Sequence, residues 1–260
     1  MKTSNLLIYL FAMVGMMAWQ AGAEDAKPKR KVLFLTKSAG FVHDVVKRPA
    51  PDKLALAEEV LTEIGASSGA FEVTCTQDPA DINAENLKKY DAVFFYTTGE
   101  LAIPNKHDLL DFVKNGKGFI GSHCAVDTFR NWQEGNVKPY IEMIGAEFQT
   151  HHAQETARIE VVDPKFPAVT HIEGPDFTIN DEWYIFKNVA PDIQPVLVLD
   201  TKSMKQENYN SLAPYPNTWR KNYGQGRVFY TALGHRGDVW HDARFQKMIL
   251  NGIRWAMRDL

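Results

Sequence analysis

The chain has 260 residues, of which 45% are hydrophobic, and it carries a formal net charge of −3. This composition is typical of a globular protein with a substantial core, and the mild acidity gives no electrostatic basis for binding nucleic acid or an anionic membrane. The two cysteines, Cys75 and Cys124, are too few for a disulfide-stabilised scaffold.

The first 23 residues have the pattern of a secretory signal peptide. Lys2 precedes an apolar run of about 14 residues, and small residues at 21–23 offer a cleavage site. The alternative is a membrane anchor, but this run is shorter than the roughly 20 residues that span a bilayer. We therefore expect cleavage after Ala23, a secreted or periplasmic protein, and no membrane span after cleavage. Loss of the single charge of Lys2 changes the net charge from −3 to −4.

Residues 24–30 are charged and contain proline, and we predict a flexible lead-in there. The remainder, 31–260, has no repeat or low-complexity segment, so we predict one domain. Its first half alternates apolar strand patterns with helical spacing. The predicted strands are 31–38, 71–78, 91–99 and 118–124, and the predicted helices are 51–69, 82–90 and 105–116. This alternation indicates β–α–β units and an α/β fold with a mainly parallel sheet and helices on both faces.

The second half of the chain is less regular. We predict helices at 139–148 and 242–257, and strands at 155–163, 181–188, 195–201 and 226–235. The last helix carries an apolar stripe that is suited to face a core. This stripe consists of Phe245, Met248, Ile249, Gly252, Ile253 and Ala256. Both cysteines fall in or beside predicted strands, so we expect two buried free thiols, with a disulfide as the alternative.

Polar residues follow four of the predicted strands at their C-terminal ends, where open parallel sheets bind ligands. They are His43 and Asp44, Glu100, His123 and Asp127, and His235, Arg236 and Asp238. A single histidine at such a place is commonly a surface residue. Three of them at one sheet edge are suited to proton transfer or to metal binding. We therefore expect these imidazoles to converge at one edge of the folded domain.

Two further groups lie in the irregular half. His151 and His152 fall in a predicted connection, and Glu182 precedes Trp183 and Tyr184, a mixture of acid and aromatic residues suited to a sugar pocket. The alternative to a sugar pocket is that Glu182 is simply exposed to solvent and that Trp183 packs in the core. The candidate substrate-binding residues are therefore His43, Asp44, Glu100, Glu182, Trp183, Tyr184 and Arg236.

The segment GFIGSHCA, residues 118–125, ends a predicted strand with serine, histidine and cysteine. A nucleophile elbow needs small residues two positions before and two positions after its apex. Gly121 and Ala125 flank His123 in this way, whereas an elbow centred on Cys124 would place the β-branched Val126 at a flank. We therefore predict His123 at the apex of a sharp bend and Cys124 turned into the structure.

Several blocks, in order from Lys31 to Ala256, together resemble the ThuA-like family, which is named for trehalose utilisation. They are KVLFLTKSAGFVHD, YDAVFFYTTG, GKGFIGSHCAVDTF, YIEMIGAEFQTHH, DEWYIF and GQGRVFYTALGH with the terminal MILNGIRWA. The family is related to class I glutamine amidotransferases, so the resemblance implies a flavodoxin-like fold. It places His123 where those enzymes have their cysteine and His235 where they have their catalytic histidine. Because an imidazole cannot form the thioester of glutamine hydrolysis, we expect no glutaminase activity.

The resemblance also implies action on trehalose-like disaccharides or their keto derivatives, with isomerase, lyase or hydrolase chemistry. One hypothesis is acid–base catalysis by His123 and His235 with Asp127 or Asp44 as the orienting group. A second is a divalent metal such as Zn²⁺ held by His43, His123, His151 and His235. A third hypothesis gives His123 only a structural role, locked by Asp127.

The rival from another class is a non-catalytic protein that binds carbohydrate or docks to a partner and keeps the amidotransferase-like fold. The partners that we expect are a small carbohydrate and, in a homo-oligomer, a second copy of the chain.

Overall fold

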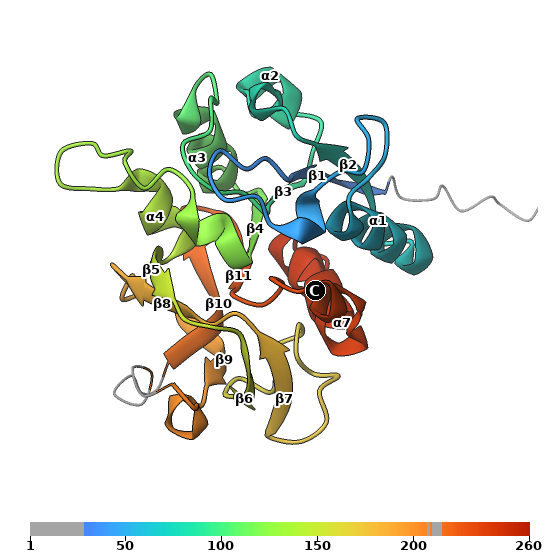
Figure 1. Cartoon of the computed structure of the whole chain (residues 1–260). Coiled ribbons are helices and arrows are strands. Elements are labelled where there is room, and N and C mark those ends of the chain that lie inside the picture. Colours follow the sequence, from blue (N-terminus) through green and yellow to red (C-terminus); the bar gives the residue numbers. More distant parts are fainter. Residues whose placement is uncertain (1–28, 207–208, 210–214) are drawn as a thin grey trace, which may run out of the picture.

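The computed structural model describes residues 29–206, 209 and 215–260. The predicted signal peptide and most of the predicted lead-in lie outside the described residues. A nine-stranded sheet in the order β2-β1-β3-β4-β11-β10-β9-β6-β7 runs through the molecule, and β5 pairs with β8 in a separate two-stranded sheet (Figure 1). None of the helices in the described residues is long and apolar enough to cross a membrane.

Five neighbouring strands of the large sheet are parallel. They are β2 (Phe71–Thr76), β1 (Arg30–Leu35), β3 (Ala92–Phe95), β4 (Gly118–Ser122) and β11 (Gly226–Thr231). Every residue of β3 and β4 is buried, as expected for strands covered on both faces. The predicted α/β fold with a parallel sheet is therefore confirmed.

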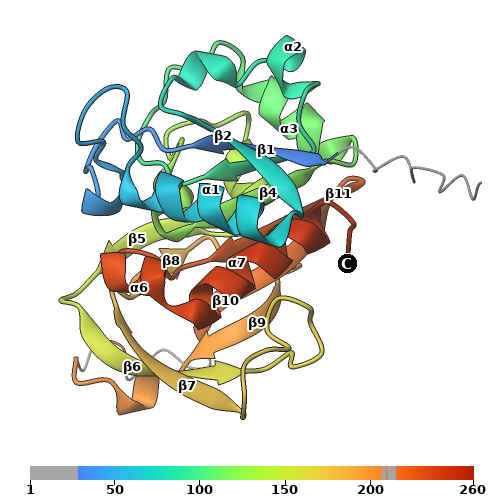
Figure 2. The same cartoon turned by 90° about the vertical axis from the view of Figure 1, so that its right-hand side faces the viewer.

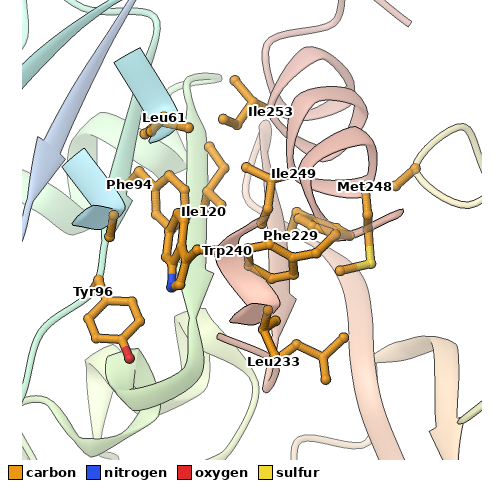
Figure 3. Close-up of a cluster of buried hydrophobic side chains, with 14 of the residues drawn as sticks. Leu61, Phe94, Tyr96, Ile120, Phe229, Leu233, Trp240, Met248, Ile249 and Ile253 are labelled. Carbon is orange, nitrogen blue, oxygen red and sulfur yellow. The ribbon is translucent and has the colours of Figure 1, made fainter. Parts of the chain in front are cut away.

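Helices cover both faces of this parallel part, as predicted. The α-helices are α1 (Leu56–Ser68), α2 (Ala84–Leu87), α3 (Lys106–Lys114), α4 (Pro139–Ile144), α6 (Gly237–His241) and α7 (Ala243–Ala256). Helices α1, α6 and α7 lie together on one face, where Leu61, Phe94 and Ile249 belong to one buried cluster (Figures 2 and 3). Helices α2, α3 and α4 cover the other face, with Leu110 and Phe119 in a second cluster.

The second half of the chain extends the sheet with antiparallel strands. They are β10 (Tyr215–Tyr223), β9 (Gln194–Leu199), β6 (Glu155–Val161) and β7 (Asp176–Asp181), and the small sheet consists of β5 (Glu147–His151) and β8 (Tyr184–Lys187). The short 3₁₀ helices are η1 (Asp44–Val46), η2 (Pro79–Asp81), η3 (His123–Asp127) and η4 (Thr201–Ser203).

Two predictions for this half need correction. The helix predicted at 139–148 ends at Ile144, because Gly145 adopts a left-handed φ of 108° and the chain continues into β5. His151 therefore lies on a strand and not in an irregular connection. The strand predicted at 181–188 is divided between the last residue of β7 and the whole of β8, and both β7 and β10 are additional to the prediction.

The two cysteines are free thiols. Cys124 is buried as expected, whereas Cys75 is only half-buried because its strand, β2, forms the edge of the sheet.

Candidate active site

His123 lies at a sharp bend directly after β4. Its φ of 46° is in the left-handed region, which residues other than glycine seldom adopt. The predicted small flanks are required by the packing, because a Cβ at Gly121 would come within 3.1 Å of three side-chain atoms, including the Cβ of Ala125. The predicted elbow with a histidine at its apex is therefore present.

Hydrogen bonds from neighbouring side chains hold this bend in place. The Ser122 hydroxyl donates to the carbonyl of Leu233 at 2.7 Å, and the Tyr230 hydroxyl donates to the carbonyl of His123 at 2.7 Å. A strained backbone persists where its surroundings over-determine it, and such strain is common at functional sites.

The imidazole of His123 is fully buried and has a defined orientation. Its Nδ1 lies 2.9 Å from the carbonyl oxygen of Ala232, so Nδ1 carries the proton and donates it to that oxygen. The ring packs on Tyr184 with 4.2 Å between centroids. This arrangement leaves the lone pair of Nε2 available, and a hydrogen bond from the other nitrogen is the usual way in which proteins orient a metal-binding histidine.

The Nε2 atom of His123 faces two other functional groups. It lies 3.2 Å from Nδ1 of His235 and 3.5 Å from Oε2 of Glu182, and His235 Nδ1 lies 3.3 Å from the same Oε2. His43 completes a set of four residues whose candidate ligand atoms all lie within 4.8 Å of one another. We call His43, His123, Glu182 and His235 the His/Glu cluster.

His43 enters this cluster from the loop between β1 and η1. Its ring is buried, with centroids 5.0 Å from His123 and 5.1 Å from His235, and its Nδ1 has no hydrogen-bond partner among the described residues. Burial and the neighbouring His123 and His235 lower the pKa of His43 to about 2. The imidazole is therefore neutral, which is the form that binds a metal.

Glu182 supplies the negative charge of the cluster. Burial acts to raise its pKa, but the neighbouring imidazoles of His123 and His235 outweigh burial and hold that pKa well below the usual range. The carboxylate is therefore ionised. Its other oxygen, Oε1, lies 3.2 Å from Nδ1 of His151, whose side chain is 44% exposed.

The geometry of the His/Glu cluster fits a metal ion. Ligand atoms about 2.0–2.1 Å from a tetrahedral zinc ion lie about 3.3 Å from one another. The separations among His123, His235 and Glu182 are 3.2, 3.3 and 3.5 Å. Three imidazoles and a carboxylate suit Zn²⁺ and other divalent transition metals. The set differs from the predicted one, because Glu182 takes the place of His151, which lies beside the carboxylate.

A second layer of hydrogen bonds positions two members of the cluster. Asp181 is fully buried and accepts hydrogen bonds from the backbone N–H groups of Gly234 at 2.7 Å and Glu182 at 3.0 Å. The carbonyl of Gly234 accepts from the Tyr96 hydroxyl and from the Trp240 indole. The sequence contained one signal for Asp181, its position directly before Glu182.

Several predicted site residues lie outside the cluster. Asp127 forms an ion pair with Arg130 at 2.9 Å, while the ring of His123 is oriented by a backbone carbonyl. Glu100 forms an ion pair with Lys106 at 3.1 Å. The structure therefore does not bring Asp127 or Glu100 to the imidazoles.

The two aromatic candidates for substrate binding, Trp183 and Tyr184, are both buried. Trp183 is buried and its indole donates to the carbonyl of Glu155, so its ring presents no open face for a sugar to stack on. Tyr184 is also buried and acts as the packing surface for His123.

Asp44 is solvent-exposed and Arg236 is half-buried. Both line a cavity of about 390 Å³ that also includes His235. Among the candidate substrate-binding residues, these two therefore lie beside the cluster and not within it.

The Cys124 thiol, which follows His123 at the elbow, is in an unreactive state. Cys124 is completely buried, and burial together with the charge of Asp127 raises the pKa of its thiol well above the usual range. A protonated buried thiol is a poor nucleophile. Cys124 is therefore not placed as an accessible nucleophile.

A family model described as ThuA, trehalose utilisation, matches residues 31–256. A ThuA-like protein from Parabacteroides merdae ATCC 43184 has a similar structure, with a TM-score of 0.69 and 19% identity over 90% of this chain and 91% of that one. A ThuA-like protein from Bacteroides uniformis ATCC 8492 gives a TM-score of 0.67 and 19% identity over 92% and 95%. At these identities the likeness shows a shared fold. None of the curated proteins matches the chain.

Proposed function

Because this chain belongs to the ThuA family, trehalose utilisation, we propose that it is an enzyme that acts on trehalose-like disaccharides or their keto derivatives with the help of a divalent metal such as Zn²⁺. The family membership supports the substrate class. The observation that carries the metal is the set of three separations near 3.3 Å among His123, His235 and Glu182. His43, whose candidate ligand atom lies within 4.8 Å of the other three, adds a fourth donor.

Each member of the His/Glu cluster has a definite part in this proposal. His43, His123 and His235 would bind the ion as neutral imidazoles, and Glu182 would neutralise part of its charge. The hydrogen bond from Nδ1 of His123 to the carbonyl of Ala232 keeps Nε2 available as a ligand. The bound ion would supply Lewis-acid chemistry by polarising a carbonyl oxygen or by lowering the pKa of a water molecule.

Proton transfer requires a group that is not a ligand, and His151 fits that role. It lies 3.2 Å from Glu182 and is accessible to solvent. In a keto sugar the C–H bond next to the carbonyl is acidic. His151 would remove this proton, and the C–H electron pair would form a carbon–carbon double bond while the carbonyl electrons move to oxygen. Where the carbon that lost its proton carries a hydroxyl group, that hydroxyl proton moves to the enolate oxygen and the abstracted proton returns to the former carbonyl carbon, which gives isomerisation. Where the next carbon carries a leaving group, the enolate electrons re-form the carbonyl, the new double bond forms beside it and the leaving group departs with a proton, which gives elimination.

A second candidate mechanism uses His123 and His235 as a metal-free acid–base pair. The contact of 3.2 Å between Nε2 of His123 and Nδ1 of His235 favours it, because one proton shared between two imidazoles can be passed to a substrate. The two mechanisms differ in one measurable property, the dependence of activity on a bound metal.

The test combines metal analysis with solvent exchange. Purified protein is analysed for metal by mass spectrometry and is then incubated with 3-keto-trehalose in deuterated water. We expect a stoichiometric divalent metal and deuterium at sugar carbons next to the carbonyl. Both should be lost in Glu182→Gln and His235→Ala and retained in His107→Ala, a histidine that pairs with Glu134 outside the cluster.

The outcomes separate the alternatives. Exchange without a metal would favour the acid–base pair of His123 and His235. The absence of both metal and exchange would overturn the enzymatic proposal and leave a carbohydrate-binding or partner-docking protein.

Export is a further part of the proposal. It is supported by the signal-peptide pattern of residues 1–23, which lie outside the described residues. N-terminal sequencing of the protein recovered from the host should give Glu24 as the first residue. A chain that keeps its own N-terminus and stays in the cytoplasm would contradict export without affecting the chemistry.

A further inference from the structure

A cavity of about 390 Å³ lies against His235, on the solvent side of the His/Glu cluster. Three separate segments contribute to it. Phe41 and Asp44 come from the loop after β1 and the start of η1, Gln154 from the connection between β5 and β6, and Arg236 and Asp238 from the end of the loop after β11 and the start of α6. Its volume is within the range of about 300–1,000 Å³ that is usual for small-molecule sites. Because His235 belongs to both, a ligand in this cavity would lie next to the cluster.

Phe41 gives the cavity a flat apolar surface. Its side chain is 68% exposed, and among the residues that the structure describes it is the one phenylalanine, tyrosine or tryptophan in the exposed class. The ring meets the ring of His43 edge-on at 4.9 Å, and the Phe41 carbonyl accepts a hydrogen bond from Thr98 at 2.9 Å, so the loop is held in place. An aromatic face beside polar groups is suited to stack against the C–H face of a sugar ring.

The charged groups of the cavity are already paired. Arg236 donates through Nε and a terminal nitrogen to both oxygens of Asp238, at 2.8–3.2 Å, and through its other terminal nitrogen to Gln154 at 2.9 Å. Asp44 forms an ion pair with Lys47 at 2.6 Å. Two carboxylates and one guanidinium line the cavity, which gives a formal charge of −1.

This pattern disfavours an anionic ligand. A phosphate or carboxylate would have to displace Asp238 from Arg236, so its pair with the guanidinium would only replace an existing pair. It would also face the charge of Asp44, which disfavours its binding. A hydroxyl group can donate to a carboxylate and also accept from the guanidinium N–H atoms that remain free. The cavity is therefore complementary to a neutral, polyhydroxylated ring.

We propose that this cavity is the subsite for a neutral sugar ring, which stacks on Phe41 and is hydrogen-bonded by Gln154 and the Arg236–Asp238 pair. The inference rests on the proposed function and narrows its substrates to neutral glycosides, to the exclusion of phosphorylated or carboxylated sugars. The ring in this subsite places the adjoining part of the substrate against His235.

Binding measurements test this assignment without turnover. The metal-loaded protein is titrated calorimetrically with trehalose and, separately, with trehalose 6-phosphate at the same ionic strength. We expect trehalose to bind at least about tenfold more tightly than trehalose 6-phosphate, which is a difference of about 1.4 kcal/mol in binding free energy. Phe41→Ala should weaken trehalose binding about three- to tenfold, as expected for the loss of one aromatic contact, whereas Phe41→Trp should retain it.

Val42→Ala is the matched control, because Val42 is the next residue, is also exposed, and lines a different cavity. It should bind trehalose as the unchanged protein does. Equal affinity in Phe41→Ala, tighter binding of trehalose 6-phosphate, or no binding of either sugar at millimolar concentrations would overturn the subsite. Metal content measured on the same samples separates the two proposals: a protein that binds trehalose through Phe41 but holds no metal would refute the metal mechanism and leave the subsite standing.

Discussion

The carboxylate of Asp181 accepts a hydrogen bond from the backbone N–H of Gly234 at 2.7 Å, and this contact joins the end of β7 to the loop that carries His235. The other carboxylate oxygen accepts the N–H of Glu182 at 3.0 Å. One buried side chain therefore sets the position of two members of the His/Glu cluster. Asp181 is a positioning residue, because it acts through its neighbours and not on the ligand.

Replacing Asp181 with asparagine should lower the affinity for the metal strongly and lower the thermal stability of the metal-free protein only slightly. Asparagine has the same shape but only one oxygen, so its amide N–H₂ would face one of the two backbone N–H donors. Losing an outer hydrogen bond of this kind typically lowers metal affinity about 10- to 100-fold. Competition with a chromogenic zinc chelator measures this affinity, and thermal unfolding of the metal-free protein measures the stability.

The control for this substitution is Asn251→Ala. Asn251 is also buried and donates to the carbonyl of Pro167 at 3.0 Å, but it lies on α7. It should lower the melting temperature and leave the affinity for zinc unchanged. If both variants lost affinity in proportion to stability, the positioning role of Asp181 would be refuted.

His151→Gln should separate proton transfer from metal binding. Glutamine can keep a polar contact with Glu182 but cannot take up a proton at neutral pH. We expect kcat for the keto sugar to fall about 10²- to 10⁴-fold, the usual contribution of a general acid or base, while the metal content stays the same. The neighbouring His152→Gln should change neither value. Loss of the metal from His151→Gln would instead identify His151 as a ligand, as in the set predicted from the sequence.

The parallel half of the fold and three of the four cluster residues could be predicted from the sequence because the signals are local. Long apolar runs mark strands that are covered on both faces. In a parallel sheet, the C-terminal ends of such strands meet at one edge, so the positions of His43, His123 and His235 after their strands already imply convergence. The bend at His123 was also predictable, since its small flanks lie within five residues of one another.

The antiparallel half of the sheet, the place of Glu182 in the cluster and the cavity beside it depend on contacts between distant segments of the chain. Strand β10 reads YPNTWRKNY, which has no clear alternation, and it is a strand because it pairs with β9 and β11 on its two sides. Glu182 was predicted only as a substrate-binding candidate, and it reaches the cluster because β7 is the last strand of the antiparallel extension and its end returns toward Gly234. The same holds for Phe41 and Gln154, which only the folded chain brings to one cavity.

The cysteines should be unreactive in the folded protein. Burial raises the pKa of the Cys75 thiol to about 11, and burial raises that of Cys124 well above its usual range. At pH 8 both thiols are therefore protonated, and iodoacetamide should modify neither at an appreciable rate, because the thiolate is the reactive form. Mass spectrometry should show two modifications after unfolding in guanidinium chloride. Rapid labelling of native Cys124 with loss of activity would contradict the assignment of the elbow to His123.

Glu147 should make the stability of the fold depend on pH. Its side chain is buried at the start of β5 and accepts hydrogen bonds from Lys138 at 2.9 Å and Asn188 at 2.7 Å. Burial acts to raise its pKa, but these hydrogen bonds and the lysine charges outweigh burial and lower it. A lowered pKa in the folded state means that the ionised form stabilises the fold. This contribution is complete above the unfolded pKa of about 4.3 and is lost as the pH falls through the folded value.

Glu147→Gln should therefore lower the free energy of unfolding by roughly 1–3 kcal/mol at pH 7, the cost of a buried group left without its charged partner. The difference from the unchanged protein should shrink below about pH 4.3, and urea unfolding at a series of pH values measures it. Glu85→Gln is the control, since Glu85 pairs with Lys88 on the surface and an exposed pair contributes little. A difference for Glu147→Gln that stayed constant down to pH 3 would show that the carboxylate acts through its shape and not through its charge.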